Sequence, residues 1–350
     1  MKRKANKRIS WLKAIVISLI LLLLVRFFCF QTYEIRGTNM SNTLLPGDLV
    51  LVNKLMYGPR MPNTLLFIPF TERRELSSGK YYFSWPQIPY NRMNGFSSIK
   101  NNDVLAFNYP EETEIPVDKR VVYIKRCAGL PGDNVQFKND ELFINKTEIA
   151  VKGTQYAYRV KSKTRNIDQF LIDRDKLQEG THLNRYGEYI LYMTAENAQV
   201  LAKQKQIISI DREKQMFNVY STVFFPNSVY YKWNGSNFGS LIVPKKGDTI
   251  QIDGNNIELY RKIIEVYEKQ KLAVLDNKIL INNKEAKYYV FKMNYYFMVD
   301  DNRDNAKDSR NWGFLPEDHI IGKVTRVLFS VNKSESEFSF RLKRTFLKVH

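Results

Sequence analysis

The segment at residues 123–133 reads Tyr123-Ile-Lys125-Arg126-Cys-Ala-Gly129-Leu-Pro131-Gly132-Asp133. It places a lysine directly after the apolar run Val121-Val-Tyr-Ile and ends in a Pro-Gly-Asp turn. On a strand, Lys125 would lie beside apolar neighbours, and burial of that kind penalises the charged ammonium form. Glycine supplies the positive φ of a tight turn and aspartate caps it. The segment therefore predicts a strand with an unusual lysine, followed by a turn.

Two other segments accompany this one. The first reads Tyr33-Glu-Ile-Arg-Gly-Thr-Asn39-Met40-Ser-Asn-Thr43-Leu44-Leu-Pro-Gly-Asp48, and the last reads Asp300-Asp301-Asn302-Arg303-Asp304-Asn305-Ala306-Lys-Asp308-Ser-Arg310-Asn-Trp312-Gly313. In order and spacing, the segments at 33–48, 123–133 and 300–313 resemble the three signature boxes of bacterial type I signal peptidases. They are called here the first, second and third box.

The resemblance implies a hydrolase with a serine nucleophile and a lysine general base. Lys125 matches the general base, and Asn39 stands at the position of the catalytic serine. Gly37 replaces a serine that helps to hold the oxyanion in many members, and Ala306 replaces one that commonly hydrogen-bonds the lysine. A carboxamide is a poor nucleophile, and loss of the attacking group removes most of the rate acceleration. Three missing hydroxyls around a retained lysine predict that cleavage is lost.

Two other hydroxyls lie near Asn39 and are the alternative nucleophiles. On an extended strand, the side chain of Thr38 points to the opposite face, while Ser41 shares the face of Asn39 but lies about 6–7 Å along the chain. Attack requires reacting atoms within about 3.5 Å, so either hydroxyl needs a turn or bulge to act with Lys125.

The third box is interpreted as a structural support. Its interleaved acidic and basic residues predict a buried network of ion pairs and turns that holds the lysine strand. The residues in question are Asp301, Arg303, Asp308 and Arg310. Family members carry a glycine where this chain has Asp300, so an extra negative charge is expected at this point.

The resemblance also implies a site for the small-x-small segment of a signal peptide, which binds by strand addition. The positions that match the neighbourhood of its side-chain pockets are Ile35, Met40, Leu44, Tyr123 and Ile124. None of these positions needs the serine, so binding is expected to survive the loss of cleavage.

The N-terminus predicts one uncleaved transmembrane anchor. A basic tail precedes an apolar run from Trp11 to Phe30, whose uncharged centre, residues 14–25, rises only about 18 Å against roughly 30 Å of hydrocarbon. Lys13 and Arg26 can extend their charges to the two interfaces, which lets the segment span. No small-x-small cleavage pattern follows. The positive-inside rule places the tail in the cytoplasm and the body on the extracytoplasmic, periplasmic side of the inner membrane.

Composition narrows the partners. The 350 residues carry 54 basic and 36 acidic side chains, a formal net charge of +18, without any nucleic-acid motif. Anionic membrane lipid is therefore the expected partner besides signal peptides, and no nucleic acid is expected. The two cysteines, Cys29 and Cys127, are not expected to form a bridge, and three scattered histidines predict neither a metal site nor a cofactor.

The body is expected to be mainly β. Gly-Asp turns precede alternating strands at 46–52, 131–137 and 246–252, with a degenerate copy at 102–107. Residues 259–269 have apolar residues at helical spacing and are predicted to form a helix. Residues 288–299 alternate and are predicted to form a strand that leads into the third box. The predicted parts are a basic tail (1–9), the anchor (10–30), a signal peptidase-like core (31–148 and 241–335), an inserted cap lobe (149–240) and a basic C-terminal tail (336–350).

Three functions remain open at this point. The first is a membrane-anchored homologue that binds signal peptides, or a partner such as an active paralogue or the secretion machinery, without cleaving. The second is an active signal peptidase, a serine endopeptidase that uses Ser41 or Thr38 with Lys125. The third is a non-catalytic structural or interaction protein of the cell envelope.

Overall fold

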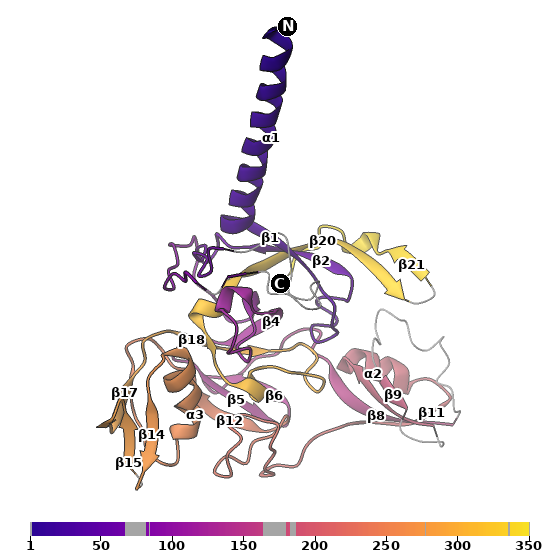
Figure 1. Ribbon diagram of the computed structural model, residues 1–350. Coiled ribbons are helices and arrows are strands. Elements are labelled where there is room, and N and C mark those ends of the chain that lie inside the picture. Colours follow the sequence, from indigo (N-terminus) through magenta and orange to yellow (C-terminus); the bar gives the residue numbers. More distant parts are fainter. Residues whose placement is uncertain are drawn as a thin grey trace.

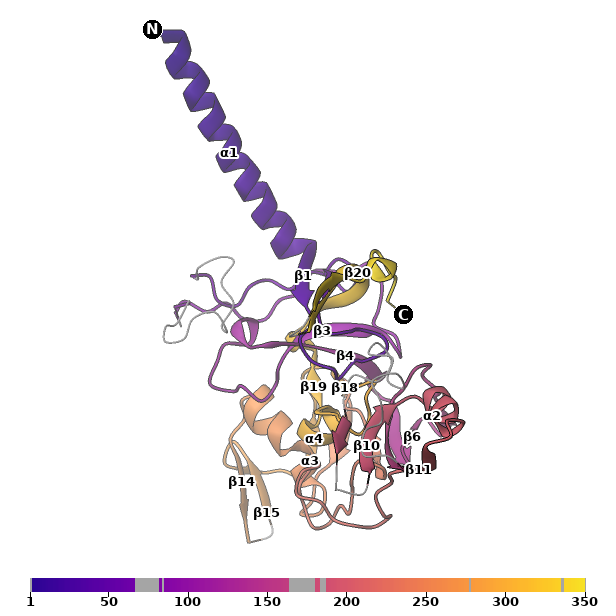
Figure 2. The same ribbon diagram turned by 90° about the vertical axis from the view of Figure 1, so that its right-hand side faces the viewer.

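The computed structural model describes residues 2–66, 82–83, 85–163, 180–182, 187–276, 278–334 and 337–349. A long N-terminal helix, α1 (Lys2–Phe28), projects from a body made mainly of strands (Figures 1 and 2). The mainly β class predicted from the sequence is confirmed.

Helix α1 has the length and composition of a membrane span. Its apolar window, Trp11–Phe28, has a mean hydropathy of 2.3, and none of it is buried against the body. Eighteen helical residues rise about 27 Å, close to the hydrocarbon thickness of a bilayer. Among the described residues, this is the one helix that passes such a test. The predicted apolar segment is therefore present as an exposed helix that is long and apolar enough to cross a membrane.

The central sheet carries the first two boxes and leads into the third. Its strand order is β1-β2-β20-β3-β4-β18-β19, with β21 paired to β20, and its pairs are antiparallel. The strands are β1 (Phe30–Glu34), β2 (Asp48–Asn53), β3 (Val104–Asn108), β4 (Val122–Gly129), β18 (Tyr295–Val299), β19 (Leu315–Pro316), β20 (Ile320–Ser334) and β21 (Glu337–Phe340). In β2, alternate residues are buried, as expected for a sheet with one face on the core.

A second sheet packs against the end of the central one. Its order is β12-β5-β6-β7, from the strands β12 (Phe238–Ile242), β5 (Asn134–Lys138), β6 (Glu141–Ile144) and β7 (Thr147–Glu148). Smaller ribbons complete this part: β13 (Thr249–Gln251) with β17 (Tyr288–Val290), and β14 (Leu272–Leu275) with β15 (Lys278–Ile281) and β16 (Lys284–Glu285). One apolar core runs beneath them and includes Phe137, Phe238 and Phe297.

Part of the segment predicted as an inserted lobe, within residues 156–212, forms a sheet of its own, whereas β12, from Phe238, belongs to the second sheet. The order of the lobe sheet is β11-β8-β10-β9, from β11 (Ile207–Arg212), β8 (Tyr156–Ser162), β10 (Glu188–Met193) and β9 (Gly180–His182). Helix α2 (Ala195–Ala202) begins where the Thr194 hydroxyl accepts a hydrogen bond from the backbone of Asn197, and it packs on this sheet through Ala198 and Leu201. Residues 164–179 and 183–186 of the predicted lobe lie outside the described residues.

The turns that the sequence marks do precede strands. The Gly-Asp segments at 46–52, 131–137 and 246–252 lead into β2, β5 and β13, and the degenerate copy leads into β3. The helix predicted at 259–269 begins two residues earlier, as α3 (Ile257–Lys262), and continues as a π-helix over Ile263–Tyr267. Three short 3-10 helices, at Val117–Lys119, Glu317–His319 and Leu342–Arg344, complete the described helices together with α4 (Ser309–Trp312).

The C-terminal residues predicted as a basic tail instead pack on the body. Arg344 donates to the buried carboxylate of Asp48 at 3.0 and 2.5 Å and to the carbonyl of Thr43 at 3.0 Å. Asp48 also accepts from the backbone of Leu45, so both groups fix the turn that ends the first box. A charge count alone gave no sign of this contact, because Arg344 and Asp48 are far apart in sequence.

The third box contains a buried ion pair between Arg310 and Asp308, whose nitrogen and oxygen atoms lie 2.9 Å apart. Burial alone would raise the pKa of Asp308, but the charge and hydrogen bonds of Arg310 outweigh it and lower the pKa. Arg310 also donates to the carbonyls of Gly235 and Arg303. One side chain thus connects the third box to the segment that precedes β12.

We expect Arg310→Met to lower the free energy of unfolding by about 3–5 kcal/mol, because it leaves the buried carboxylate of Asp308 without its partner. Lys278→Met is the matched control: it removes one member of the exposed pair Lys278–Glu285 and should cost less than about 1 kcal/mol. Chemical denaturation followed by fluorescence measures both. Equal losses in the two variants would contradict the structural role of Arg310.

Candidate functional site

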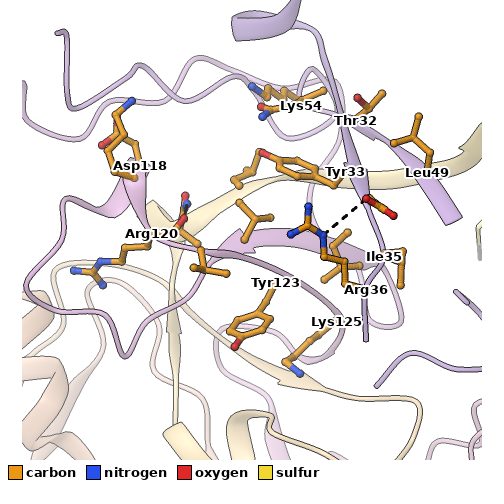
Figure 3. Close-up of a pocket in the computed structure, with 18 of the residues that line it drawn as sticks. Thr32, Tyr33, Ile35, Arg36, Leu49, Lys54, Asp118, Arg120, Tyr123 and Lys125 are labelled. Atoms are coloured by element: carbon orange, nitrogen blue, oxygen red, sulfur yellow. Dashed lines mark hydrogen bonds and ion pairs between the residues drawn. The ribbon is translucent and has the colours of Figure 1, made fainter. Parts of the chain in front are cut away.

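A groove of about 800 Å³ lies between β1, the first box and β4. One end is lined by Arg26, Phe27 and Lys54 at the base of α1, and the other by Asn39 and Lys125. Figure 3 shows Lys54 near one end of the close-up and Tyr123 and Lys125 at the other, with the Arg36 side chain between them. The groove thus connects the base of the apolar helix to the boxes.

Lys125 is positioned by the centre of the sheet. It lies on β4 opposite Leu105 of β3, and the register of β4 with β18 pairs Arg126 with Val299. The residue after Val299 is therefore carried next to Lys125. Lys125 is only 1% exposed. The sequence predicted a buried lysine on a strand, and the structure places it in that position.

The Lys125 amine is bonded to Asp300. Its Nζ lies 2.5 Å from Oδ1 and 2.6 Å from Oδ2 of a carboxylate that is 0% exposed. Within the described residues, the hydrogen bonds of this amine go to Asp300 alone. Asp300 also accepts from the Asn39 amide at 3.3 Å and from the backbone N–H of Lys307 at 3.1 Å.

In this geometry the Lys125 amine is engaged with Asp300 whichever of the two groups carries the proton. Burial raises the pKa of Asp300 above its ordinary value, with a further contribution from the charge of Asp308, and the charge and hydrogen bonds of Lys125 and the hydrogen bond of the Asn39 amide offset only part of that rise. If the proton is on nitrogen, the ammonium has no lone pair. If it is on the carboxyl, that O–H donates to the nitrogen lone pair. A general base needs a free lone pair within hydrogen-bond reach of the nucleophile, and this contact takes it.

The first box is a turn and not an extended strand at the nucleophile position. The backbone of Ser41 donates to the carbonyl of Thr38 at 2.9 Å, and that of Leu44 donates to Met40 at 2.8 Å. Ser41 is 1% exposed, and neither Ser41 nor Thr38 lines the groove. The turn that Ser41 or Thr38 would need in order to act with Lys125 is therefore present, but it places neither residue in the lining of the groove. Asn39 does line the groove.

Asp301 ties the three boxes together. Arg126 of the second box donates to both of its oxygens, at 2.7 and 2.8 Å, and the hydroxyl of Thr43 in the first box donates at 2.5 Å. The backbone of Asn302 donates to the carbonyl of Asn39 at 2.9 Å. The neighbouring carboxylates, Asp300 and Asp301, therefore bind neighbouring cations of β4.

The predicted support residues divide into two groups. Asp301, Asp308 and Arg310 belong to buried ion pairs. Arg303 does not: its Nε and Nη1 have no hydrogen-bond partner among the described residues, and its guanidinium lies 5.6 Å from the ring centroid of Phe137. The expected ion pair of Arg303 is therefore replaced by a contact with an aromatic ring.

The predicted peptide-binding residues also divide. Ile35, Met40, Tyr123 and Ile124 line the groove. Leu44 does not, because it is fully buried in the core cluster with Val50 and Val52. The turn through the first box directs Leu44 into the core, and the spacing of the box gave no sign of this.

Two features in and beside the groove were not predicted from the sequence. Asp300 was noted as an added charge, but its bond to Lys125 was not foreseen. The opposite charges of Lys125 and Asp300 would have predicted this bond if the register of β4 and β18 had been known. Lys54 carries no sequence signal, because a single lysine after a strand belongs to no motif.

A protein-family model described as "Signal peptidase, peptidase S26" matches residues 8–209 and 240–329. This chain belongs to the peptidase S26 signal peptidase family. The family match includes the apolar helix and all three boxes.

Individual relatives agree with the family. A "Signal peptidase I" of Buchnera aphidicola subsp. Schizaphis graminum is 26% identical over 327 residues, 92% of this chain and 75% of that protein. "Signal peptidase I P" of Bacillus subtilis subsp. natto is 26% identical over 233 residues, 64% of this chain and 93% of that protein. A crystal structure of a signal peptidase I from Enterococcus faecalis aligns over 65% of this chain and 98% of that chain, at 14% identity and a TM-score of 0.25. The family assignment rests on the sequence matches.

We expect Asn39→Ser alone to leave a preprotein uncleaved, because Asp300 still holds the Lys125 amine. The double variant Asn39→Ser/Asp300→Gly should cleave at least about 100-fold faster than the single variant, since a general base contributes about that factor or more. Cleavage is measured by mass spectrometry of the released peptide.

Adding Lys125→Ala to the double variant should abolish the restored cleavage, and thermal melting confirms that each variant is folded. Equal rates for Asn39→Ser with and without Asp300→Gly would contradict the role assigned to Asp300.

Proposed function

We propose that this chain is a membrane-anchored member of the signal peptidase family that binds signal peptides of exported preproteins without cleaving them. The observation that carries the proposal is the bond between Lys125 and Asp300, with Asn39 donating to the same carboxylate. The general-base position is occupied and the nucleophile position holds a carboxamide. Ser41 and Thr38, which are the alternative nucleophiles, do not line the groove.

Peptide binding is supported by the part of the groove that does not depend on a hydroxyl. Ile35, Met40, Tyr123 and Ile124 offer an apolar lining beside the first box and β4. An extended segment can bind such a surface through main-chain hydrogen bonds, with its small side chains in shallow pockets. The bound preprotein would then be presented intact to an active paralogue or to the secretion machinery.

The proposed topology follows from the anchor. Positive charges at residues 2–8 precede the span, so the N-terminus lies in the cytoplasm and the body on the periplasmic face of the inner membrane. The proposed parts are the core at 31–148 and 241–335 and the inserted lobe at 149–240. The separate sheet of β8 to β11, within residues 156–212, supports the proposed lobe.

The test uses the full chain in detergent micelles. A fluorescent peptide with a small-x-small segment should bind with micromolar or tighter affinity and stay intact. A peptide with bulky residues at both small positions should bind with an affinity at least about tenfold lower. Fluorescence anisotropy measures binding, and mass spectrometry detects any product.

Two outcomes would contradict the proposal. Cleavage that is lost in both Lys125→Ala and Ser41→Ala would identify an active peptidase that uses Ser41. Equal binding of both peptides, or none, would favour a structural protein that has kept only the fold.

A further inference from the structure

A second cavity, of about 240 Å³, lies where the third box meets the inserted lobe. Its lining comes from three stretches of chain: the lobe, with Ala157 and residues 213–215; the segment before β12, with Ser236; and the third box, with Arg303 and Asp304. None of its lining residues belongs to the groove that contains Lys125. Residues 214 and 215 are exposed, so the cavity is open to solvent on that side.

Arg303 brings a buried charge without a hydrogen-bond partner to this cavity. Its side chain belongs to a residue that is only 4% exposed, and its Nε and Nη1 find no acceptor among the described residues. The carboxylates of Asp301 and Asp308 act on its charge, but each already forms an ion pair with another arginine. A buried donor without an acceptor is costly, and more so when it is charged. The cavity beside Arg303 therefore lacks an acceptor.

The Ser236 hydroxyl is a second donor in the same lining. Ser236 is 2% exposed, and its oxygen accepts a hydrogen bond from the backbone N–H of Gln215 at 2.9 Å. A hydroxyl can accept and donate at once, and within the described part of the chain no group accepts the Ser236 proton. Two donors from separate segments thus face one cavity, and both need the same kind of partner, an acceptor.

Other charged groups of the lining already have partners or lie in solvent. Arg310 is bonded to Asp308, with a nitrogen–oxygen distance of 2.9 Å. Glu213 forms an ion pair with Arg159. Lys214 is exposed, so solvent and salt screen its charge. Arg303 is therefore the buried cation of this cavity that an anion would neutralise.

Asp304 limits that anion to one negative charge. One of its oxygens accepts from the backbone N–H of Ala157 at 2.8 Å, and its side chain lines the cavity. Burial raises the pKa of Asp304, because negative charge is poorly solvated at this point. A phosphate dianion would place two more negative charges beside this group. A carboxylate adds one charge and offers two acceptor oxygens, one for each donor.

The size of the cavity restricts the rest of the ligand. A volume of about 240 Å³ is below the range of pockets that hold drug-sized molecules, roughly 300–1,000 Å³. Apolar contacts are available from Ala157, Phe224 and Ala306. The lining therefore fits a carboxylate on a short body with a small apolar group.

We propose that this cavity binds a carboxylate, that of a small organic acid or of the C-terminal residue of a peptide, with Arg303 as the charged donor and Ser236 as the second donor. Burial, followed by the charge of Arg310, lowers the pKa of Arg303, and a bound anion acts in the opposite direction. The ligand contacts the lobe and the third box together, at the point where Asp304 already joins them.

The experiment titrates acetyl-alanyl-alanine with a free C-terminus into the full chain in detergent micelles and measures the heat of binding. The peptide should bind with a Kd of about 1 mM or less, and its amidated form at least about tenfold more weakly, because it lacks the charge. Arg303→Met should also weaken binding at least about tenfold, and Ser236→Ala about threefold. Arg326→Met is the matched control, because Arg326 is exposed and outside the cavity, and it should change nothing.

Thermal melting separates a binding role of Arg303 from a structural one. Without ligand, Arg303→Met should melt at the same temperature as the unmodified chain or higher, because it removes a buried charge and keeps an apolar contact with Phe137. With the free-acid peptide, the melting temperature of the unmodified chain should rise, and that of Arg303→Met should not. A fall in Arg303→Met as large as in Arg310→Met would show a structural role and overturn the proposal.

Competition identifies the source of the carboxylate. Displacement of the peptide by an equal concentration of propionate supports a small organic acid, and no displacement supports a peptide C-terminus. Equal binding of the acid and the amide, tighter binding of inorganic phosphate, or unchanged binding in folded Arg303→Met would overturn the proposal. So would no binding up to about 10 mM peptide, since water would then satisfy the donors. The groove assay stays independent when its small-x-small peptide is amidated.

Discussion

Two adjacent buried carboxylates hold this molecule's centre together. Asp301 receives Arg126 and Thr43, and Asp300 receives Lys125. The antiparallel register of β4 and β18 brings these charges face to face. Removal of one member of a buried pair leaves an uncompensated charge, which costs several kcal/mol. The network that joins the three boxes therefore also includes the bond between Lys125 and Asp300.

The two ends of the groove consequently differ in character. At one end, Asn39, Lys125 and Asp300 form a closed set of hydrogen bonds. At the other end, the buried Lys54 donates to the carbonyls of Arg26 and Phe27 at the base of α1.

The sequence carried much of this structure, for physical reasons. Apolar length predicts the anchor, Gly-Asp turns predict the starts of β2, β5 and β13, and the box spacing identifies Lys125. What it could not provide depends on contacts distant in the chain. The turn that buries Leu44 and Ser41, the pairing of Arg344 with Asp48, and the bond from Lys125 to Asp300 all require the register of neighbouring strands. Arg303 was expected to form an ion pair, and only the packed core shows that it lies against Phe137.

The central claim is that the Lys125 amine has no hydroxyl to activate, even with a peptide in the groove. A crystal structure of the chain with a bound small-x-small peptide tests it through one distance, from Lys125 Nζ to the nearest hydroxyl oxygen of the protein. The account predicts that Asp300 remains bonded to the amine and that no hydroxyl lies within about 3.2 Å, the reach of a general base. A Ser41 or Thr38 hydroxyl within that distance, with Asp300 displaced, would contradict it.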